Sequence, residues 1–250
     1  MSDEHIQLYV GLDDTDSPRI YCTTYATFKT VKAILSEFNV RFLDYPLLVR
    51  LNPNIPWKTR GNGANAIKLE IESSQIDDIK KVIIETVVQH SDLEHQNCDP
   101  AIVFFSNKCH QLPNILKEFY KSALTEIVTP ENAINICNKI GANIVFLKKG
   151  YNRGVVGALA VLGALSYDED FTYELLAYRQ VSNWGKKRLI DEKSVITMDE
   201  ITRPITFNNY DYERERVLIT PKGPDPVLVG IRGELPNALF RCERAYHHRN

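Results

Sequence analysis

Hydrophobic positions in the first half of the chain follow two spacings, and polar turns separate the segments. Alternating apolar and polar residues, or short apolar runs, predict strands at residues 6–12, 40–51, 66–71 and 101–105. Apolar residues three or four positions apart predict a helix that begins near Thr23 and a second helix at residues 76–89. The resulting order, β-α-β-β-α-β, is that of a split βαβ unit and fits a ferredoxin-like sheet.

The second half of the chain predicts a further set of helices and strands. Helices are expected at residues 112–123, 130–140 and 155–165, a strand at 144–147, a strand or buried helix at 171–178, two apolar segments at 217–219 and 227–231, and a final helix from Pro236. The polar stretch at residues 122–130 predicts a domain boundary, with one domain at 1–128 and another at 129–250. The predicted fold class is α/β (α+β).

Composition narrows the functional classes. The chain has 250 residues and a net charge of -2, so it is not a polycation that coats nucleic acid, and phosphate recognition would need local basic clusters. The five cysteines include no C-x-x-C pair, which predicts reduced thiols rather than a zinc site. Neither a membrane-spanning run nor a secretion signal is found, so a cytoplasmic location without membrane association is expected.

An acidic turn follows the first predicted strand. Asp13, Asp14 and Asp16 lie within four positions, and Ser17 comes next. Closely spaced carboxylates repel each other, and Mg²⁺ is a cation that would hold them together because it prefers hard oxygen ligands. The alternative is an ordinary Asp/Ser/Thr turn that caps the next helix.

Two hydroxyl groups stand at the predicted start of that helix. Thr23 and Thr24 could cap backbone amides or bind a phosphate there. Thr23 could also accept a phosphoryl group. The local pattern leaves these alternatives open.

A proline-rich basic loop separates the second and third predicted strands. Lys58 and Arg60 supply donors for phosphate oxygens, and Gly61 and Gly63 in the segment that follows expose backbone amides. The glycines do not form a dinucleotide fingerprint because they lead into a strand, and no Walker lysine loop occurs. A triphosphate site would therefore set Asp-bound Mg²⁺ opposite Lys58 and Arg60. The alternative is a rigid hairpin connection.

A third candidate site precedes the Gly/Ala-rich helix at residues 155–165. Lys148, Lys149 and Arg153 stand just before this helix, where they could form an anion-binding helix start. The small residues of the helix are equally consistent with close packing against a neighbour.

Two long motifs carry a family resemblance. The segments V-G-L-D-D-T-D-S-P-R-x-x-C-T-T-Y and R-L-N-P-N-I-P-W-K-T-R-G-N-G resemble the opening of the archaeal 2-agmatinylcytidine synthetases, which modify a minor isoleucine tRNA. Further matches run through Lys149 and Arg153, Phe207-Asn208 and Asp225 to Arg232. The resemblance covers nearly the whole chain.

The resemblance implies an enzyme and assigns roles to the two motifs. Family members phosphorylate the wobble cytidine with ATP, and agmatine then displaces the phosphate. Their kinase-like N-terminal domain is followed by a ferredoxin-like domain. By this resemblance Asp13, Asp14 and Asp16 bind Mg²⁺-ATP, Thr23 is phosphorylated, and Lys58 and Arg60 contact phosphates.

The remaining binding residues are also expectations from the resemblance. Phe207, Asn208, Asp225 and Arg232 are candidates for substrate binding, with an acidic group for the cationic ends of agmatine. Ser17, Thr24, Gly61, Asn62, Gly63, Lys149 and Arg153 are candidates for nucleotide binding.

Two departures from the family pattern keep other interpretations open. Ile20-Tyr21 stand near where the family usually has a glycine, and the family's OB-fold and zinc ribbon are missing. The chain is then a shortened form, one half of a split enzyme whose other chain carries those modules, or a relative that has lost the full reaction. The rival functions are a Mg²⁺-dependent phosphohydrolase or phosphotransferase of small molecules, and a non-catalytic RNA-binding subunit.

Overall fold

The computed structural model divides the chain into two compact units, residues 1–166 and residues 167–250. In the first unit it describes residues 4–18, 22–43, 46–58, 62–108 and 111–166. In the second unit it describes the backbone of five short strands, at residues 172–174, 207–208, 210–211, 216–217 and 228–231.

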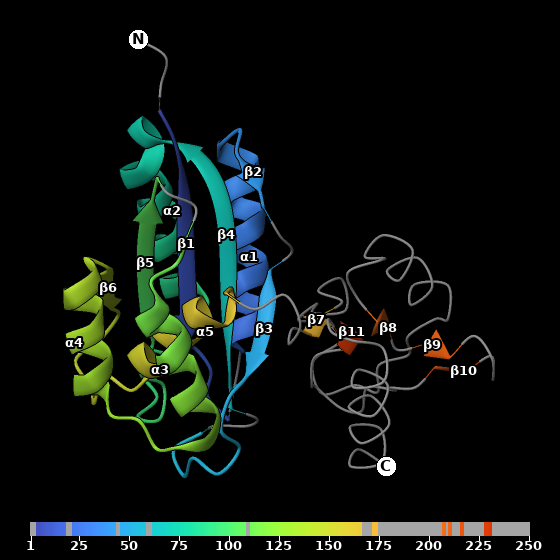
Figure 1. The fold of residues 1–250 in the computed structure, drawn as a ribbon, viewed down its shortest axis with the longest axis vertical. Helices are drawn as coiled ribbons and strands as arrows, with labels where there is room; N and C mark the ends of the chain where they lie inside the picture. The colour runs from blue at the N-terminus through green and yellow to red at the C-terminus, as the bar shows by residue number, and fades with distance from the viewer. Residues whose placement is uncertain are drawn as a thin grey trace. The chain divides into compact units, whose positions relative to one another are not determined.

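The first unit is built on an antiparallel sheet with the strand order β6-β5-β1-β4-β3, and β2 also pairs with β4 (Figure 1). The strands are β1 (His5–Asp13), β2 (Arg41–Phe42), β3 (Leu47–Arg50), β4 (Gly63–Glu72), β5 (Ala101–Asn107) and β6 (Asn143–Phe146). The first elements follow the predicted β-α-β-β-α-β order, except that two short strands, β2 and β3, replace the single strand predicted at residues 40–51. The chain is therefore of the α+β class.

Helices cover both faces of this sheet. They are α1 (Thr23–Glu37), α2 (Ile76–Gln89), α3 (Asn114–Thr125), α4 (Pro130–Ile140) and α5 (Gly154–Ala164), with a 3₁₀ turn at Ser73–Gln75. Alternate residues of β1, such as Leu8 and Val10, pack with Ile34 of α1 and Ile79 of α2 in one apolar core. The intervening residues of β1 face α5, which contacts β1, β4 and β5 and is backed by α3.

Helix α5 is buried along its whole length because its sequence, GVVGALAVLGA, is apolar on every side. It lies so close to β1 that a Cβ atom on Gly11 would stand 1.9 Å from the carbonyl oxygen of Ala158. Only glycine permits this approach. The contact brings the start of α5 against the end of β1, where the acidic turn begins.

The described residues of the second unit form two small antiparallel groups of strands. One joins β7 (Thr172–Glu174), β11 (Leu228–Ile231) and β8 (Phe207–Asn208), and the other pairs β9 (Tyr210–Asp211) with β10 (Arg216–Val217). Three of these strands fall in or next to the segments predicted at residues 171–178, 217–219 and 227–231. The helix predicted from Pro236 lies outside the described residues.

The boundary between the units differs from the one that the sequence predicts. The expected break at residues 128/129 falls inside the first unit, which extends to Ser166. The reason is long-range packing: β6 pairs with β5, and α5 lies against β1, β4 and β5. The polar stretch at residues 122–130 therefore consists of the last turn of α3, the loop at residues 126–129 and the start of α4, and is not a linker between units.

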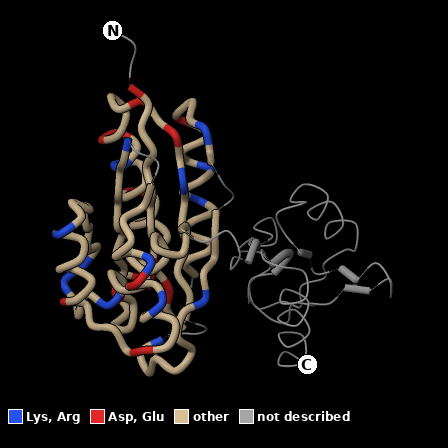
Figure 2. The backbone as a smooth tube through the Cα atoms, in the orientation of Figure 1, with Lys and Arg blue, Asp and Glu red and all other residues tan. Residues whose placement is uncertain are grey.

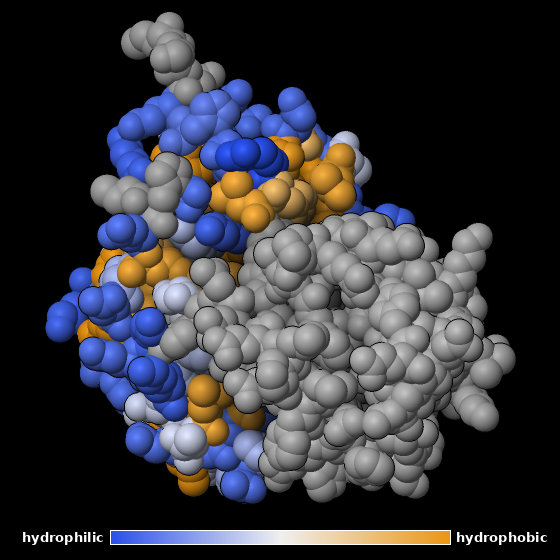
Figure 3. Space-filling view, turned by 45° about the vertical axis from the view of Figure 1, so that its right-hand side comes forward, coloured by the Kyte–Doolittle hydropathy of each residue, from blue (hydrophilic) through white to orange (hydrophobic). Residues whose placement is uncertain are grey.

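The surface of the first unit is mixed in character. Figure 2 shows acidic and basic residues close together around the end of the sheet where β1 ends. Figure 3 shows apolar patches that are separated from each other on the face it presents, as is ordinary for a folded domain. Within the described ranges, no helix combines the length and apolar character needed for a bilayer crossing.

Candidate functional site

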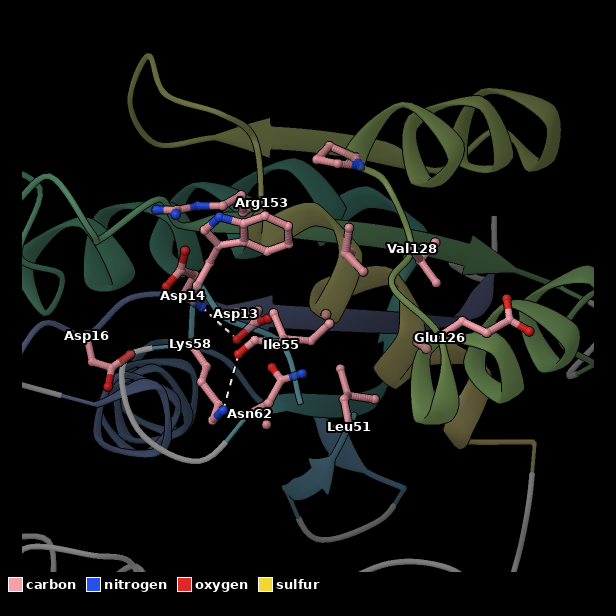
Figure 4. Close-up of a pocket in the computed structure, with 16 residues that line it drawn as sticks. Asp13, Asp14, Asp16, Leu51, Ile55, Lys58, Asn62, Glu126, Val128 and Arg153 are labelled. Atoms are coloured by element: carbon pink, nitrogen blue, oxygen red, sulfur yellow. Dashed lines mark hydrogen bonds between the residues drawn. The ribbon is translucent and has the colours of Figure 1, made fainter. Parts of the chain in front are cut away.

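A pocket lies where β1 ends, and both sequence motifs contribute to its walls (Figure 4). Asp13, Asp14 and Asp16 come from the acidic turn, Lys58 from the basic loop, and Arg153 from the start of α5. The carboxylates of Asp13 and Asp14 lie between Arg153 and Lys58 in this view. The pocket volume of about 130 Å³ is roughly ten times the space that one water needs. A charged ligand much larger than water can therefore enter.

The acidic turn contains one residue in the left-handed conformation, and hydrogen bonds hold the turn in place. Asp14 has a φ of 60°, the left-handed conformation that Asp and Asn tolerate better than most residues. Its N–H donates to Oδ1 of Asp13 at 2.7 Å. Further along the turn, the hydroxyl of Ser17 donates to Asp92 at 2.6 Å, and the N–H of Asp92 donates to the carbonyl of Thr15 at 3.2 Å. The segment before β5 therefore fixes the turn from outside the pocket.

The two central carboxyl groups are difficult to ionise in this arrangement. Burial raises the pKa of Asp13 to about 8, opposed by the N–H of Asp14 and assisted by the charge of Asp16. Burial also raises the pKa of Asp14 well above its usual range, and the charge of Asp13 raises it further, while Arg153 lowers it. A bound cation would remove the repulsion between these groups and favour their ionised forms.

These shifts predict how the stability of the metal-free protein depends on pH. Between about pH 4 and pH 8 the folded protein keeps a proton on Asp13 that the unfolded chain has lost, so its stability should fall as the pH rises through this range. Thermal unfolding without divalent cations, recorded from pH 5 to pH 9, measures the effect. Asp13→Asn removes one of the two carboxyl groups with a raised pKa and should make the curve shallower, with the contribution of Asp14 remaining. An identical pH dependence in wild type and variant would contradict the raised pKa.

The residues of the acidic turn fit Mg²⁺ together with a phosphate ligand. Among the described residues, no three His, Cys, Asp or Glu side chains converge closely enough to hold a metal ion by themselves. Mg²⁺ commonly takes one or two carboxylates and completes its shell with phosphate oxygens and water. Asp13 and Asp14 would supply those carboxylates, and Lys58 and Arg153 would neutralise the remaining phosphate charge.

Asn52 organises the basic loop. Its side chain, buried and 4% exposed, donates to the carbonyl of Glu126 at 3.1 Å and accepts from the N–H of Asn54 at 2.9 Å. Its backbone carbonyl accepts from the side chain of Asn62 at 2.9 Å, and its N–H donates to the carbonyl of Ala123 at 3.0 Å. The loop is therefore fastened to the end of α3, which explains how Lys58 reaches the pocket.

Lys58 itself is exposed. Its ammonium group donates to the carbonyl of Ile55 at 3.2 Å, a contact within its own loop that a phosphate could replace. The neighbouring side chain of Trp57 also lines the pocket and is 53% exposed.

The structure brings together some of the predicted site residues and separates others. Those that line the pocket are Asp13, Asp14, Asp16, Lys58, Asn62, Gly63 and Arg153. Thr23 does not line it: its hydroxyl is buried and accepts from the hydroxyl of Thr15 at 3.2 Å. Ser17, Thr24 and Lys149 are also outside the pocket lining.

Other predicted site residues belong to parts of the chain outside the described side chains. Arg60, Gly61, Asp225 and Arg232 lie outside the residues whose side chains are described, and Phe207 and Asn208 are described only as the backbone of β8. Their roles stay predictions.

Sequence reasoning missed an apolar wall and a close glycine contact. Leu51, Ile55, Trp57, Ala123, Val128, Pro130 and Val156 form the apolar wall. A Cβ atom on Gly157 would stand 1.8 Å from Oδ2 of Asp13, so this glycine makes room for the carboxylate. The only local indication was the run of small residues in α5, which did not reveal what packs against them.

Two family models match the chain. The model of the TiaS TCKD domain matches residues 9–79, and the model of the TiaS FLD domain matches residues 152–250. The second match begins at residue 152 and so includes α5. The unit boundary comes later, after Ser166, because α5 packs with the first unit.

Similar proteins agree with these matches. The chain is 44% identical to TiaS of Methanocaldococcus jannaschii, a 2-agmatinylcytidine synthetase of an isoleucine tRNA, over 91% of its length. It is 45% identical to the synthetase of the same name from Pyrococcus horikoshii, over 90%. These alignments cover 53% and 51% of the relatives, so the chain spans about half their length.

Solved structures give the same result. The complex of TiaS with its isoleucine tRNA and ATP is similar with a TM-score of 0.69 and 35% identity, over 96% of this chain and 55% of that one. The complex of TiaS with the same tRNA, AMPCPP and agmatine gives a TM-score of 0.67 and 34% identity, over 96% and 56%. The chain therefore belongs to the TiaS family of isoleucine-tRNA 2-agmatinylcytidine synthetases.

Proposed function

We propose that the chain carries out the ATP-dependent attachment of agmatine to the wobble cytidine of the minor isoleucine tRNA, or forms the catalytic half of an enzyme that does so. In this reaction ATP phosphorylates the carbonyl oxygen at C2 of cytidine, and the amine of agmatine then displaces the phosphate. The relatives named above are synthetases of this kind, and solved TiaS complexes contain the isoleucine tRNA with ATP or an ATP analogue and agmatine. A tRNA substrate also leads us to propose a cytoplasmic location.

One observation carries this proposal: the acidic turn and Lys58, which are distant in the sequence, line the same pocket. Phosphoryl transfer depends mainly on positioning and charge neutralisation, and this pocket offers both. Asp13 and Asp14 would bind Mg²⁺ on the triphosphate, with Asp16 beside them. Lys58 would neutralise the developing phosphate charge from the opposite side.

The role of Thr23 is the least direct part of the proposal. It lies at the first position of α1, and its hydroxyl pairs with Thr15, which follows Asp14 in the acidic turn. To accept a phosphoryl group, this hydroxyl would have to leave Thr15 and turn toward the nucleotide. We therefore propose phosphorylation of Thr23 as a step coupled to a rearrangement of the turn.

Agmatine and the remaining modules complete the proposal. Phe207, Asn208, Asp225 and Arg232 stay candidates for agmatine binding, as does Arg60 for phosphate binding. We also propose a partner chain with the OB-fold and zinc ribbon as one way to complete the tRNA-binding surface.

The direct test incubates the chain with γ-labelled ATP, Mg²⁺, agmatine and the minor isoleucine tRNA. We expect labelled phosphate on the protein and an agmatine-modified cytidine, detected by mass spectrometry of nuclease digests. The assay is repeated with the C-terminal part of the M. jannaschii relative added. If neither product forms in either arm, the proposal is contradicted. Phosphate release from small molecules without tRNA would support a phosphohydrolase instead.

A further inference from the structure

Asp99 is a buried carboxylate, 3% exposed, that stands just before β5 and contacts both sides of the pocket. Its N–H donates to the carbonyl of Asp14 at 3.3 Å, and its own carbonyl accepts from the N–H of Gly154 at 3.2 Å. Its Oδ2 accepts from the N–H of Arg153 at 2.9 Å. One residue therefore connects the acidic turn with the start of α5.

The guanidinium group of Arg153 is held beside this carboxylate but is only loosely bonded. Nε lies 3.6 Å from Oδ2 of Asp99, which is an ion pair without a hydrogen bond, and this buried nitrogen has no acceptor among the residues that the structure describes. Nη2 donates to the carbonyl of Asn97 at 3.4 Å, and the group stacks 5.5 Å from the ring centre of Tyr151. Arg153 thus lines the pocket with hydrogen-bonding capacity left for an anion.

The position of Asp99 is fixed by its neighbours. A Cβ atom on Gly150 would stand 2.3 Å from its Oδ1, and one on Gly154 would stand 2.6 Å from its carbonyl oxygen. Asp99 is therefore packed against two glycines of the segment that carries Arg153, Gly150 at its carboxylate and Gly154 at its backbone carbonyl. Its geometry, in addition to its charge, determines where that segment lies.

We propose that Asp99 is a positioning residue, which holds Arg153 so that its guanidinium group meets the phosphates of the nucleotide bound at the acidic turn. This inference rests on the proposed function, because it assumes that the pocket binds a magnesium triphosphate. Asp99 carries the same sign of charge as the ligand. If it acted only through its charge, its removal would strengthen binding, whereas a positioning role requires that its removal weaken binding.

The test is a double-mutant cycle on Mg²⁺-ATP affinity, measured by calorimetry on the full chain. Asp99→Asn keeps the shape and an acceptor for the N–H of Arg153, but removes the ion pair. We expect Arg153→Gln to weaken binding about tenfold, the order for one charge-assisted contact, and Asp99→Asn to weaken it by about fivefold or more. In the Arg153→Gln background, Asp99→Asn should no longer weaken binding, since nothing remains to be positioned.

A second variant keeps the charge of Asp99 and disturbs only its place. Gly150→Ala adds a methyl group against Oδ1, so it should weaken Mg²⁺-ATP binding in wild type and have no such effect when Arg153 is absent. If Asp99→Asn does not fold, Gly150→Ala still tests the positioning role of Asp99.

Glu70→Gln is the matched control. It breaks the ion pair of Glu70 with Arg41 (2.7 Å). Glu70 is paired with Gln7 near the other end of β1, and the six residue steps from Gln7 to Asp13 span roughly 20 Å of strand. The variant should therefore leave the affinity for Mg²⁺-ATP unchanged.

The outcomes separate the inference from the proposed function. If wild type binds Mg²⁺-ATP but Asp99→Asn strengthens binding, or weakens it equally in both backgrounds, the positioning role is wrong and the proposed function stands. If wild type binds neither Mg²⁺-ATP nor magnesium tripolyphosphate, both are wrong.

Discussion

Replacement of Asp14 by asparagine is expected to lower the rate of ATP-dependent phosphoryl transfer by about 10³-fold, the order expected when several kcal/mol of metal-borne charge stabilisation is lost. The same change should raise the thermal stability of the metal-free protein. Asp14 is partly buried beside Asp13 and Asp16, and these surroundings raise its pKa well above the usual range. A neutral amide removes that repulsion, and asparagine tolerates the φ of 60° at this position. Transfer from labelled ATP and the metal-free melting temperature give the two results.

The opposite signs of the two effects make this prediction specific. A variant that merely damages the fold would lose activity and stability together, whereas Asp14→Asn should lose the first and gain the second. Each kcal/mol gained would raise the melting temperature by roughly 2–4 °C in a protein of this size. The control is Asp78→Asn, which removes an exposed acid from the first turn of α2. It should leave activity unchanged and lower stability by about a few tenths of a kcal/mol. Full activity of Asp14→Asn would rule out Asp14 as a metal ligand.

Elements whose ends are set by nearby residues were predictable from the sequence. Residues 130–140 were expected as a helix, and α4 has these bounds. Pro130 occupies its first turn, the hydroxyl of Thr129 accepts from the N–H of Asn132, and Gly141 ends it at a φ of 72°. Each of these contacts spans only a few residues. Local chemistry therefore determines this helix.

Elements that depend on distant partners were not predictable in the same way. A strand was predicted at residues 144–147, one residue from the bounds of β6, but its pairing with β5 was not predicted, and this pairing places it in the first unit. The polar stretch at residues 122–130 has the composition of a linker. The pairing of β6 with β5 and the packing of α5 on the sheet together show that the chain stays in the same unit on both sides of it.

The residues of the candidate site likewise fall into those that the sequence predicts and those that it does not. The carboxylates and Lys58 are visible in the sequence because their residue types suit metal and phosphate binding, and both line the pocket. Asn52 and Asp99, which fix the loop and the start of α5, look like ordinary polar residues in the sequence. Their importance arises from hydrogen bonds to segments far along the chain, such as those from Asn52 to Glu126 and from Arg153 to Asp99.

Replacement of Gly157 by alanine is expected to reduce activity about 10²-fold with little change in stability. The added methyl group would stand 1.8 Å from Oδ2 of Asp13, so this carboxylate must rotate out of place. Rotation would also break the bond that its Oδ1 accepts from the N–H of Asp14. Displacement of a catalytic group by about 1 Å can cost 10²-fold in rate. Stability should change little, because alanine favours a helix over glycine by up to about 1 kcal/mol and offsets the lost bond.

Gly163→Ala, in the same helix, is the matched control with the opposite outcome. Its methyl group would stand 2.0 Å from the carbonyl oxygen of Leu116, and this backbone atom cannot rotate away as a side chain can. Helices α3 and α5 would have to separate, at a cost of about 1–3 kcal/mol in unfolding free energy. Below its lowered melting temperature, however, this variant should still transfer phosphate. Chemical denaturation and labelled-ATP assays on both variants test the contrast. If Gly157→Ala kept its activity, the carboxylate of Asp13 would not be needed where it lies against α5, and the assignment of the pocket to metal binding would have to be abandoned.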